Sequence, residues 1–568
     1  MFFQTHLTRS SWYFLQTVSG LQIHVIGQWE LDGKQQSGYE MAAAFTATQE
    51  ESIHSFKQII TRANGNFAVV ILGRNHAFLA ADQIRSYPLF HHRHGDTVTI
   101  TDRVGGCREQ EHVTPAETSL HEFLSSGFVY EGKTIYREFT ALQAGEFVRI
   151  DGMGRISSRR YLRFLPDLSQ HTTVPDGFPE QADRLLLDVF RRLLASCPPG
   201  ARLVLPLSGG YDSRLIANYL YRLGVRDVLC FSYGTPDDTT EAPISREVAR
   251  RLNYEWHFVE YTPELWHEVI ASEETEQYLR FACSGVSLPH LQDYPAIREL
   301  KRRGVLKAGD IIIPGHTGDF LFGNHLLPEL FQKNFNPLRL LARRHTLFWL
   351  PDSSNRRSLR TVLKNNREIP ADVFFETFNW QERQAKFIVN SIRVYEWFGF
   401  DWRLPLWDKE LMLAWAGVPA PLRYRRRLFR QLWNEKFAVP QLRDYPTSHE
   451  LEADAPEPFL KFTLIKFLIA FPLLKIPMKY LFSGRYSVAP HPLLLHEYFS
   501  AATERVGDYF TVPEMPGSIQ RRIRREARRR VRSAYSNGLL AAYTLKIMLS
   551  PTGKSSCCPS PGTDRGNS

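Results

Sequence analysis

The chain has 568 residues, of which 43% are hydrophobic, 13% aromatic and 23% charged. At roughly 100–200 residues per domain, this length and composition exclude a single small binding module and a chain that is disordered throughout. The formal net charge of +10 is concentrated in two arginine-rich runs, 423–430 and 521–532, and the rest of the chain is slightly acidic, so the protein is not a uniformly basic binder of polyanions.

Short runs rich in β-branched residues alternate with turn residues over positions 1–165. This pattern predicts a layered, β-rich N-terminal domain. The expected strands cover residues 21–29, 65–73, 76–82, 96–102 and 145–151.

The pattern changes after a proline-rich stretch at 164–180. Strand-like and helix-like segments now alternate with short connections, which predicts a parallel α/β sheet. The expected strands are 201–207, 228–232, 256–261 and 311–313, and the expected helices are 181–195, 212–223, 241–252 and 295–303. Residues 375–550 are predicted to be mostly helical, and the small, polar residues from 550 onward to be disordered.

The cysteines and the apolar stretches predict a cytoplasmic protein. Only two of the six cysteines are adjacent, and none forms a Cys-x-x-Cys pair or a Cys/His cluster, so we expect neither a disulfide framework nor a zinc site. The N-terminus lacks the basic and apolar segments of a signal peptide. The most apolar stretch, 459–482, contains four lysines, so no membrane-spanning helix is predicted.

The main chemical motif lies at the first strand-to-helix turn of the α/β region, residues 206–213, with the sequence PLSGGYDS. Two glycines allow a tight turn with exposed N–H groups, which can hold an anion together with the serine hydroxyls and the start of the following helix. Asp212 places a carboxylate where a magnesium ion between phosphates would lie. The alternative is an ordinary glycine-rich turn; a Walker A loop is excluded because no lysine follows the glycines.

This string resembles the SGGxDS loop of the ATP pyrophosphatase superfamily, whose members cleave ATP between the α- and β-phosphates. Three further resemblances point to the asparagine synthetase family within it. Residues 314–323, PGHTGDFLFG, are similar to that family's SGEGxDExFGG loop, and residues 401–408, DWRLPLWD, resemble its E-x-R-x-P-[FL]-x-D segment. In the N-terminal region, 65–68 and 82–90 resemble its GxFAF and D-x-x-G-x-x-PLY signatures.

The resemblance covers residues from about 1 to 450 and implies an α/β fold of several parts. Residues 1–165 are expected to form an Ntn-hydrolase-like layered α+β domain of the glutamine amidotransferase type. Residues 180–450 are expected to form a Rossmann-like parallel α/β ATP pyrophosphatase domain with a mainly helical C-terminal part. A basic helical extension, 451–549, and a disordered tail, 550–568, follow.

The resemblance also implies ATP and Mg²⁺ as ligands. The expected metal-binding residues are Asp212 and Asp319. The residues expected to contact ATP are Leu207, Ser208, Gly209, Gly210, Asp212, Ser213, Tyr233, Pro314 and Gly315.

The sequence departs from the family in the N-terminal domain. Glutamine-dependent relatives use a cysteine made N-terminal by removal of Met1, but position 2 is Phe2 and no cysteine precedes Cys107. We therefore expect a scaffold without glutaminase activity, with a wrongly assigned start codon or a binding role as the alternatives. Nitrogen would then arrive as free ammonia, from a separate glutaminase, or as an amine already on the substrate.

The synthetase region departs as well. His316 replaces the glutamate that the family uses near the acyl-adenylate, and Phe320 replaces the glutamate of its Asp-Glu pair. His316 is either the general base for the attacking amine or only a polar loop residue. The family's late lysine has no clean counterpart, so the expected cationic catalytic residues are Arg443 and Arg427, the latter within the run 423–430.

The sequence thus predicts an AMP-forming carbon-nitrogen ligase that activates a carboxylate as an acyl-adenylate for attack by ammonia or an amine. The acceptor is aspartate, a surface-polysaccharide sugar acid or a peptide closed in the manner of lasso-peptide cyclases. The rivals are a non-catalytic nucleotide-binding protein and a tRNA-modifying enzyme, although the N-terminal domain argues against nucleic acid. Stretch 459–482 and the run 521–532 leave open a peripheral contact with the inner face of the membrane.

Overall fold

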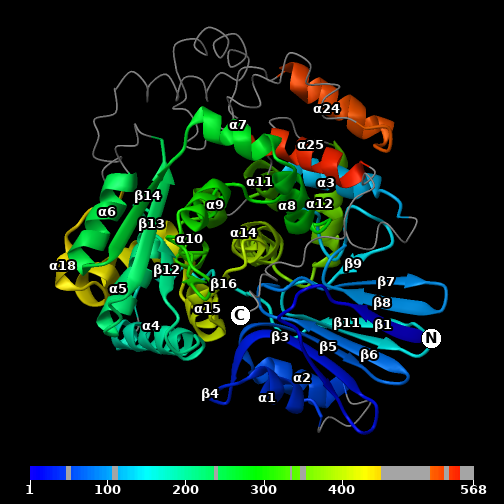
Figure 1. The fold of residues 1–568 in the computed structure, drawn as a ribbon, viewed down its shortest axis with the longest axis horizontal. Coiled ribbons are helices and arrows are strands. Elements are labelled where there is room, and N and C mark those ends of the chain that lie inside the picture. The colour runs from blue at the N-terminus through cyan, green and yellow to red at the C-terminus, as the bar shows by residue number, and fades with distance from the viewer. Residues whose placement is uncertain are drawn as a thin grey trace, which may run out of the picture.

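The computed structural model describes residues 1–46, 53–104, 113–174, 176–235, 241–332, 335–345, 353–448, 512–529 and 536–550 (Figure 1). The apolar stretch 459–482, Cys107 and the predicted disordered residues beyond Ser550 lie outside these ranges.

The N-terminal domain consists of two stacked β-sheets. One has the strand order β11-β10-β6-β5-β3-β2, with β4 beside β3, and the other has the order β1-β8-β7-β9. Val70, Leu79 and Ile100 belong to the apolar layer shared by both sheets, whereas Phe56 and Ile60 on α2 pack on the opposite face of the larger sheet. The strands are β1 (Phe2–His6), β2 (Tyr13–Gln16), β3 (Gln22–Leu31), β4 (Lys34–Gln35), β5 (Asn64–Leu72), β6 (His76–Ala81), β7 (Phe90–His94), β8 (Thr97–Thr101), β9 (Thr140–Ala141), β10 (Glu146–Asp151) and β11 (Ile156–Arg160); the helices are α1 (Gly38–Ala43), α2 (Ile53–Arg62) and α3 (Glu117–Ser126).

The layered α+β class is therefore confirmed, but several strands were not predicted. Strands β5 and β6 are buried on both faces, which explains their continuous apolar runs. Strand β1 was missed because its polar residues alternate at a sheet edge, where it pairs in parallel with the distant strand β8. Strand β9 has two residues and is defined only by its pairing with β7.

The second domain is built on a five-stranded parallel sheet with the order β14-β13-β12-β15-β16. Helices α5 and α6 pack against β12 to β14, and α9 packs against β14 from the other side of the sheet (Figure 1). The strands are β12 (Leu203–Pro206), β13 (Val228–Gly234), β14 (Glu255–Glu260), β15 (Ile311–Ile312) and β16 (Asp401–Trp402), and the first helices are α4 (Phe178–Ala195), α5 (Tyr211–Arg222), α6 (Glu241–Leu252), α7 (Pro263–Ala271), α8 (Glu273–Cys283) and α9 (Tyr294–Arg302).

The strand order reverses at β12, which lies between β13 and β15. In open parallel sheets, ligands bind at such a switch point, outside the carboxyl ends of the strands. The loops that follow β12 and β15 carry the two predicted nucleotide motifs, so the topology brings them together. The Rossmann-like parallel sheet is confirmed.

Mostly short helices follow β15 along the chain, in agreement with the predicted helical part up to residue 448. They are α10 (Gly318–Leu321), η1 (Pro328–Phe331), α11 (Pro337–Arg344), α12 (Ser353–Asn365), α13 (Ala371–Phe378), the π-helical η2 (Asn379–Ile388), η3 (Val389–Ile392), α14 (Arg393–Trp397), η4 (Pro405–Trp407), α15 (Lys409–Ala416), α16 (Ala420–Arg423), η5 (Tyr424–Arg426), α17 (Arg427–Leu432), η6 (Trp433–Phe437) and α18 (Pro440–Arg443).

The last helices, α24 (Gly517–Arg529) and α25 (Ser536–Leu549), return to the body of the protein. Helix α25 packs against α8 and α3, and α24 also contacts α3 (Figure 1). Arg522, from the basic run 521–532, is buried and donates to the His121 carbonyl at 3.0 Å and to Ser125 Oγ at 2.9 Å. At least this arginine serves packing within the chain. None of the helices in the described ranges has the length and apolar character needed to cross a bilayer.

The two domains are joined by buried hydrogen bonds. Gln83 Nε2 donates to the Trp407 carbonyl at 2.7 Å, and Trp380 Nε1 donates to the Gln83 carbonyl at 2.8 Å. Lys386 Nζ donates to the Val129 carbonyl at 2.8 Å. The N-terminal domain therefore supports η2, a helix whose other side faces the nucleotide motifs.

Candidate functional site

The phosphate loop joins β12 to α5. Ser208 N donates to Ser213 Oγ at 3.0 Å, and Gly210 N lies 3.3 Å from Ser208 Oγ. Helix α5 begins after Gly210 without a side-chain cap. A helix N-terminus beside two serines and two glycines is suited to bind the oxygens of a phosphate.

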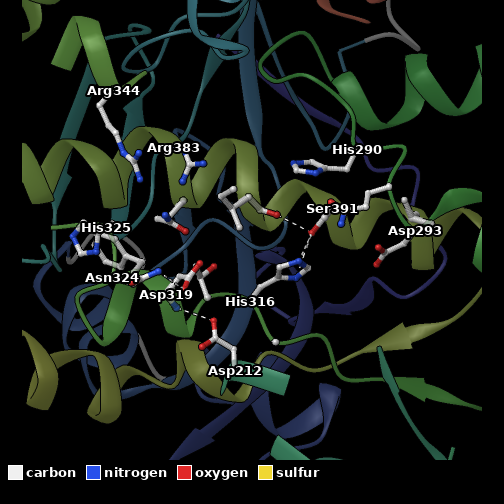
Figure 2. Close-up of a pocket in the computed structure, with 17 residues that line it drawn as sticks. Asp212, His290, Asp293, His316, Asp319, Asn324, His325, Arg344, Arg383 and Ser391 are labelled. Atoms are coloured by element: carbon white, nitrogen blue, oxygen red, sulfur yellow. Dashed lines mark hydrogen bonds between the residues drawn. The ribbon is translucent and has the colours of Figure 1, made fainter. Parts of the chain in front are cut away.

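The structure brings Asp212 and Asp319 together, although they are 107 residues apart in the sequence. Asp319 N donates to Asp212 Oδ2 at 2.8 Å (Figure 2). Gly318 permits this approach, because a Cβ atom there would lie 2.5 Å from Asp212 Oδ1. The predicted metal-binding pair thus lies at the carboxyl ends of adjacent strands, next to the phosphate loop.

A cation already bridges the two aspartates. Arg426 Nη2 lies 2.9 Å from Asp212 Oδ1 and also forms an ion pair with Asp319 Oδ1. The pair therefore presents negative charge that a cation neutralises, and its oxygen atoms are the ligands that Mg²⁺ prefers. Within the described ranges, no cluster of three or more His, Cys, Asp and Glu side chains could hold a metal, so this pair would depend on phosphate and water for its remaining ligands.

Arg426 was not singled out from the sequence. Its neighbour Arg427 was, but Arg427 is exposed on α17, whereas the Arg426 side chain is only 7% exposed. Arg425 and Arg426 have φ values of 53° and 59°, which turn the chain between α16 and α17. Left-handed, non-glycine residues of this kind are uncommon and cluster at functional sites. The sequence does not show which of several consecutive arginines is buried, because this depends on the backbone conformation.

Arg443, the other predicted cation, is also exposed. It lies at the end of the short helix α18. Neither Arg443 nor Arg427 lines the cavity described next.

A cavity of about 310 Å³ opens beside the aspartate pair. His316 lines it and lies within 3.2 Å of Ser391 Oγ (Figure 2). Burial lowers the pKa of His316 to about 4, against the opposing charge of Asp212. His316 is therefore neutral at pH 7 and can accept a proton.

Phe320 contributes an apolar ring to the cavity lining. It is fully buried and stacks on His325, with ring centroids 4.5 Å apart, and on Trp407 at 5.8 Å. The position at which the family has a glutamate is thus part of the apolar core.

Below Phe320, a closed ion-pair cluster holds the surrounding helices. Glu376 accepts from Arg423 at 2.7 and 2.8 Å and from His325 Nε2 at 2.8 Å, and Glu376 and Arg423 are both fully buried. Burial raises the pKa of Glu376, but the charge of Arg423 and the hydrogen bonds from Arg423 and His325 outweigh it and hold the pKa at about 2. Arg423, the first arginine of the run, is therefore structural.

The residues predicted to contact adenosine lie along the same edge of the sheet. Leu207 is buried after β12, and Tyr233 Oη, in β13, donates to Asp293 Oδ1 at 2.6 Å. Tyr395 Oη donates to the other oxygen of Asp293 at 2.5 Å. Pro314 and Gly315 follow β15, and a Cβ atom on Gly315 would lie 3.0 Å from Ser213 N. Asp293, which also lines the cavity, had no recognisable signal in the sequence.

The N-terminal signatures have a different environment. Asp82 is fully buried and accepts from Phe67 N at 2.8 Å, Ile84 N at 2.9 Å and Ser86 N at 3.2 Å. Phe2 begins β1 with its side chain 74% exposed. The described residues up to 174 contain no cysteine. Asp82 of the second signature therefore binds the backbone of its own loop and of β5, which carries the first signature.

Comparisons with known proteins agree with the motifs in the second domain. The family model for asparagine synthase matches residues 182–438. A comparison with curated proteins gave no match.

Three similar solved structures share little sequence with this chain. The glutamine phosphoribosylpyrophosphate amidotransferase from B. subtilis, complexed with ADP and GMP, is 10% identical, with 53% of this chain and 56% of that chain covered and a TM-score of 0.18. The allosteric regulatory enzyme of purine biosynthesis is 11% identical, with 53% and 55% covered and a TM-score of 0.19. The NH3-dependent NAD synthetase from Campylobacter jejuni subsp. jejuni NCTC 11168, in complex with the nitrate ion, is 15% identical, with 35% and 91% covered and a TM-score of 0.20.

The chain spans just over half the length of the first two of these structures, and TM-scores this low carry no argument about its function. The family match rests on the region that holds the phosphate loop, the aspartate pair and the cavity. Residues 182–438 of this chain are thus similar to the asparagine synthase family.

Proposed function

We propose that the chain is an AMP-forming amide ligase, which uses ATP to activate a carboxylate and then transfers the acyl group to ammonia or an amine. The observation that carries this proposal is the Asp212–Asp319 pair, which lies between the phosphate loop and the cavity beside His316. This arrangement supports a nucleotide site at the phosphate loop and an acceptor site in the cavity, both next to one pair of carboxylates.

The phosphate loop, 208–213, binds the β- and γ-phosphates of ATP through its N–H groups and hydroxyls. Asp212 and Asp319 would hold Mg²⁺, which would offset the negative charge of the phosphates. Arg426, which pairs with both aspartates in the structure, is the cation proposed to neutralise the departing pyrophosphate. Arg426 takes the cationic role in this proposal because Arg427 and Arg443 are exposed outside the cavity.

The chemistry has two steps. An oxygen of the acceptor carboxylate bonds to the α-phosphorus, and the bond from that phosphorus to the bridging oxygen of pyrophosphate breaks. The amine nitrogen then bonds to the acyl carbon, AMP leaves, and the nitrogen gives a proton to a base. Neutral His316, positioned by Ser391, is the proposed base.

The amine comes from outside the N-terminal domain, either as ammonia, from a separate glutaminase, or on the acceptor itself. The described residues up to 174, which contain no cysteine, offer no thiol for glutamine hydrolysis. In this proposal the N-terminal domain acts as a support, because its hydrogen bonds hold η2 against the cavity.

A non-catalytic nucleotide-binding protein is the second candidate. Phe320 is buried in the core where the family has a carboxylate, and Arg426 occupies the aspartate pair. Such a protein would bind ATP without turnover.

One experiment separates these functions. The purified protein is incubated with radiolabelled ATP, Mg²⁺, an ammonium salt and a panel of carboxylates, and AMP and ADP are resolved. ATP binding is measured in parallel by calorimetry. We expect AMP and pyrophosphate in equal amounts with at least one acceptor. ATP binding without AMP would favour the non-catalytic protein, and the absence of ATP binding would overturn both.

A further inference from the structure

The cavity has a positively charged wall that the proposed chemistry does not use. Arg344, at the end of α11, and Arg383, on the π-helical η2, both line it. Figure 2 shows both side chains directed into the same space, above Asp319 and Asn324.

Both arginines lack a partner among the residues that the structure describes. Within the described ranges, neither Arg344 nor Arg383 forms a hydrogen bond or an ion pair with any residue. Burial and the charge of Arg344 lower the pKa of Arg383 to about 10. Two neighbouring guanidinium groups in a partly buried wall are costly without a counter-ion, because each remains charged at neutral pH.

The acids of the cavity have partners other than these two arginines. Asp212 and Asp319 share Arg426, and Asp293 accepts from two tyrosines. Glu382, next to Arg383, forms an ion pair with the fully buried Lys386 at 2.6 Å. None of these acids therefore forms an ion pair with Arg344 or Arg383 in the part of the chain that the structure describes.

The histidines of the cavity do not serve as counter-ions for the two arginines. Burial, with the charge of His316 adding to it, lowers the pKa of His290 to about 4. Burial likewise lowers the pKa of His325, although Glu376 opposes this change. At pH 7 His290 is therefore a neutral hydrogen-bonding group.

The position of Arg383 is fixed by the N-terminal domain. Glu131 N donates to Glu382 Oε1 at 3.0 Å, and Lys386 Nζ donates to the Val129 carbonyl at 2.8 Å. These bonds hold η2 on both sides of Arg383. A guanidinium held in this way loses little entropy when it binds an anion.

We propose that Arg344 and Arg383 form a subsite for a second anionic group of the acceptor, so that the acceptor is a small acid with a further carboxylate or phosphate. This inference names the acceptor class of the proposed ligase and rests on that function. The anionic group binds the arginine wall, which leaves the reacting carboxylate to lie toward Asp319 and His316. The volume of about 310 Å³ is at the lower end for small-molecule sites, roughly 300–1,000 Å³, and favours a compact acid over a folded peptide.

The test measures binding without ATP, so that it does not depend on turnover. Succinate and butyrate form one pair of probes, and phosphoglycolate and glycolate form another; within each pair, one member lacks the second anionic group. Calorimetry on the full chain gives the four affinities. We expect the dianion of at least one pair to bind about ten- to a hundredfold more tightly than its monoanion, and the preferred pair identifies carboxylate or phosphate.

Two variants and a control locate the site. Arg383→Gln and Arg344→Gln should each remove most of that preference. Arg343→Gln should keep it, because Arg343 lies on the same helix, is exposed and pairs with Glu329. Because Arg344 is exposed, Arg344→Gln should fold even if Arg383→Gln does not.

Equal affinity for both members of each pair, no binding of any probe, or a preference that survives both substitutions would overturn the proposal. The same dianion preference in a protein that forms no AMP would support the subsite and count against the ligase function.

Discussion

Asp82 in the N-terminal domain and Asp212 in the synthase domain both follow a strand and both belong to a family signature, yet their surroundings differ. Asp82 is fully buried, and its oxygens are taken up by three backbone N–H groups and Ser86 Oγ. Asp212 is partly exposed, accepts one backbone N–H group and shares Arg426 with Asp319. In the proposed function, the first signature serves folding and the second serves chemistry.

The largest expected effect is on stability, at Asp82. Asp82→Ala leaves three buried N–H groups without an acceptor, so the free energy of unfolding should fall by about 3–5 kcal/mol. Denaturant unfolding measures this change. Asp96→Ala, an exposed acid of the same domain, is the control and should change the free energy by less than about 0.5 kcal/mol. If Asp82→Ala lowers the free energy of unfolding by less than about 1 kcal/mol, the structural role of Asp82 is contradicted.

At Asp212 the effect should fall on the reaction. Asp212→Asn keeps an oxygen that can accept from Asp319 N but loses the charge that binds a cation. AMP release should fall by about 10²–10³-fold, with the free energy of unfolding changed by less than about 1 kcal/mol. Unchanged turnover would rule out the metal-binding role, and unfolding would show that Asp212 resembles Asp82 after all.

The closed cluster of Glu376, Arg423 and His325 predicts a dependence of stability on pH. Because its partners hold the pKa of Glu376 at about 2, below its ordinary value of 4.5, the ionised form is favoured in the folded state. Its contribution is present above pH 4.5 and is lost as the pH falls toward 2. Between these values the free energy of unfolding should fall more steeply in the parent protein than in Glu376→Gln. Equal slopes would contradict the role of this ion pair.

The smallest effect should distinguish two adjacent arginines. Arg426→Ala should lower AMP release by about ten- to a hundredfold and weaken ATP binding. Arg427→Ala should leave both within about twofold, because its side chain is exposed outside the cavity. A larger loss in Arg427→Ala than in Arg426→Ala would support the assignment of Arg427 made from the sequence alone.

The sequence predicted those parts of the site that lie in short, local motifs. The phosphate loop, Asp319 and the residues after β15 were identified because their spacing is set by one strand-to-helix turn. Arg426, Asp293 and Arg383 were not, because their roles depend on distant segments that meet only in the fold. The sequence analysis named Arg427 and not Arg426. A left-handed turn decides which of the two side chains points inward, and the order of residues does not reveal this turn. Strands β1 and β9 were missed for the same reason, since pairing with distant strands defines them.

The central claim is that an acceptor carboxylate attacks the α-phosphorus of ATP at the Asp212–Asp319 pair. The most direct test uses the acceptor that gives the fastest AMP release, labelled with ¹⁸O in its carboxylate, and mass spectrometry of the AMP formed. The account predicts one ¹⁸O atom in the phosphate of each AMP. AMP without label, or label in inorganic phosphate formed with ADP, would contradict it.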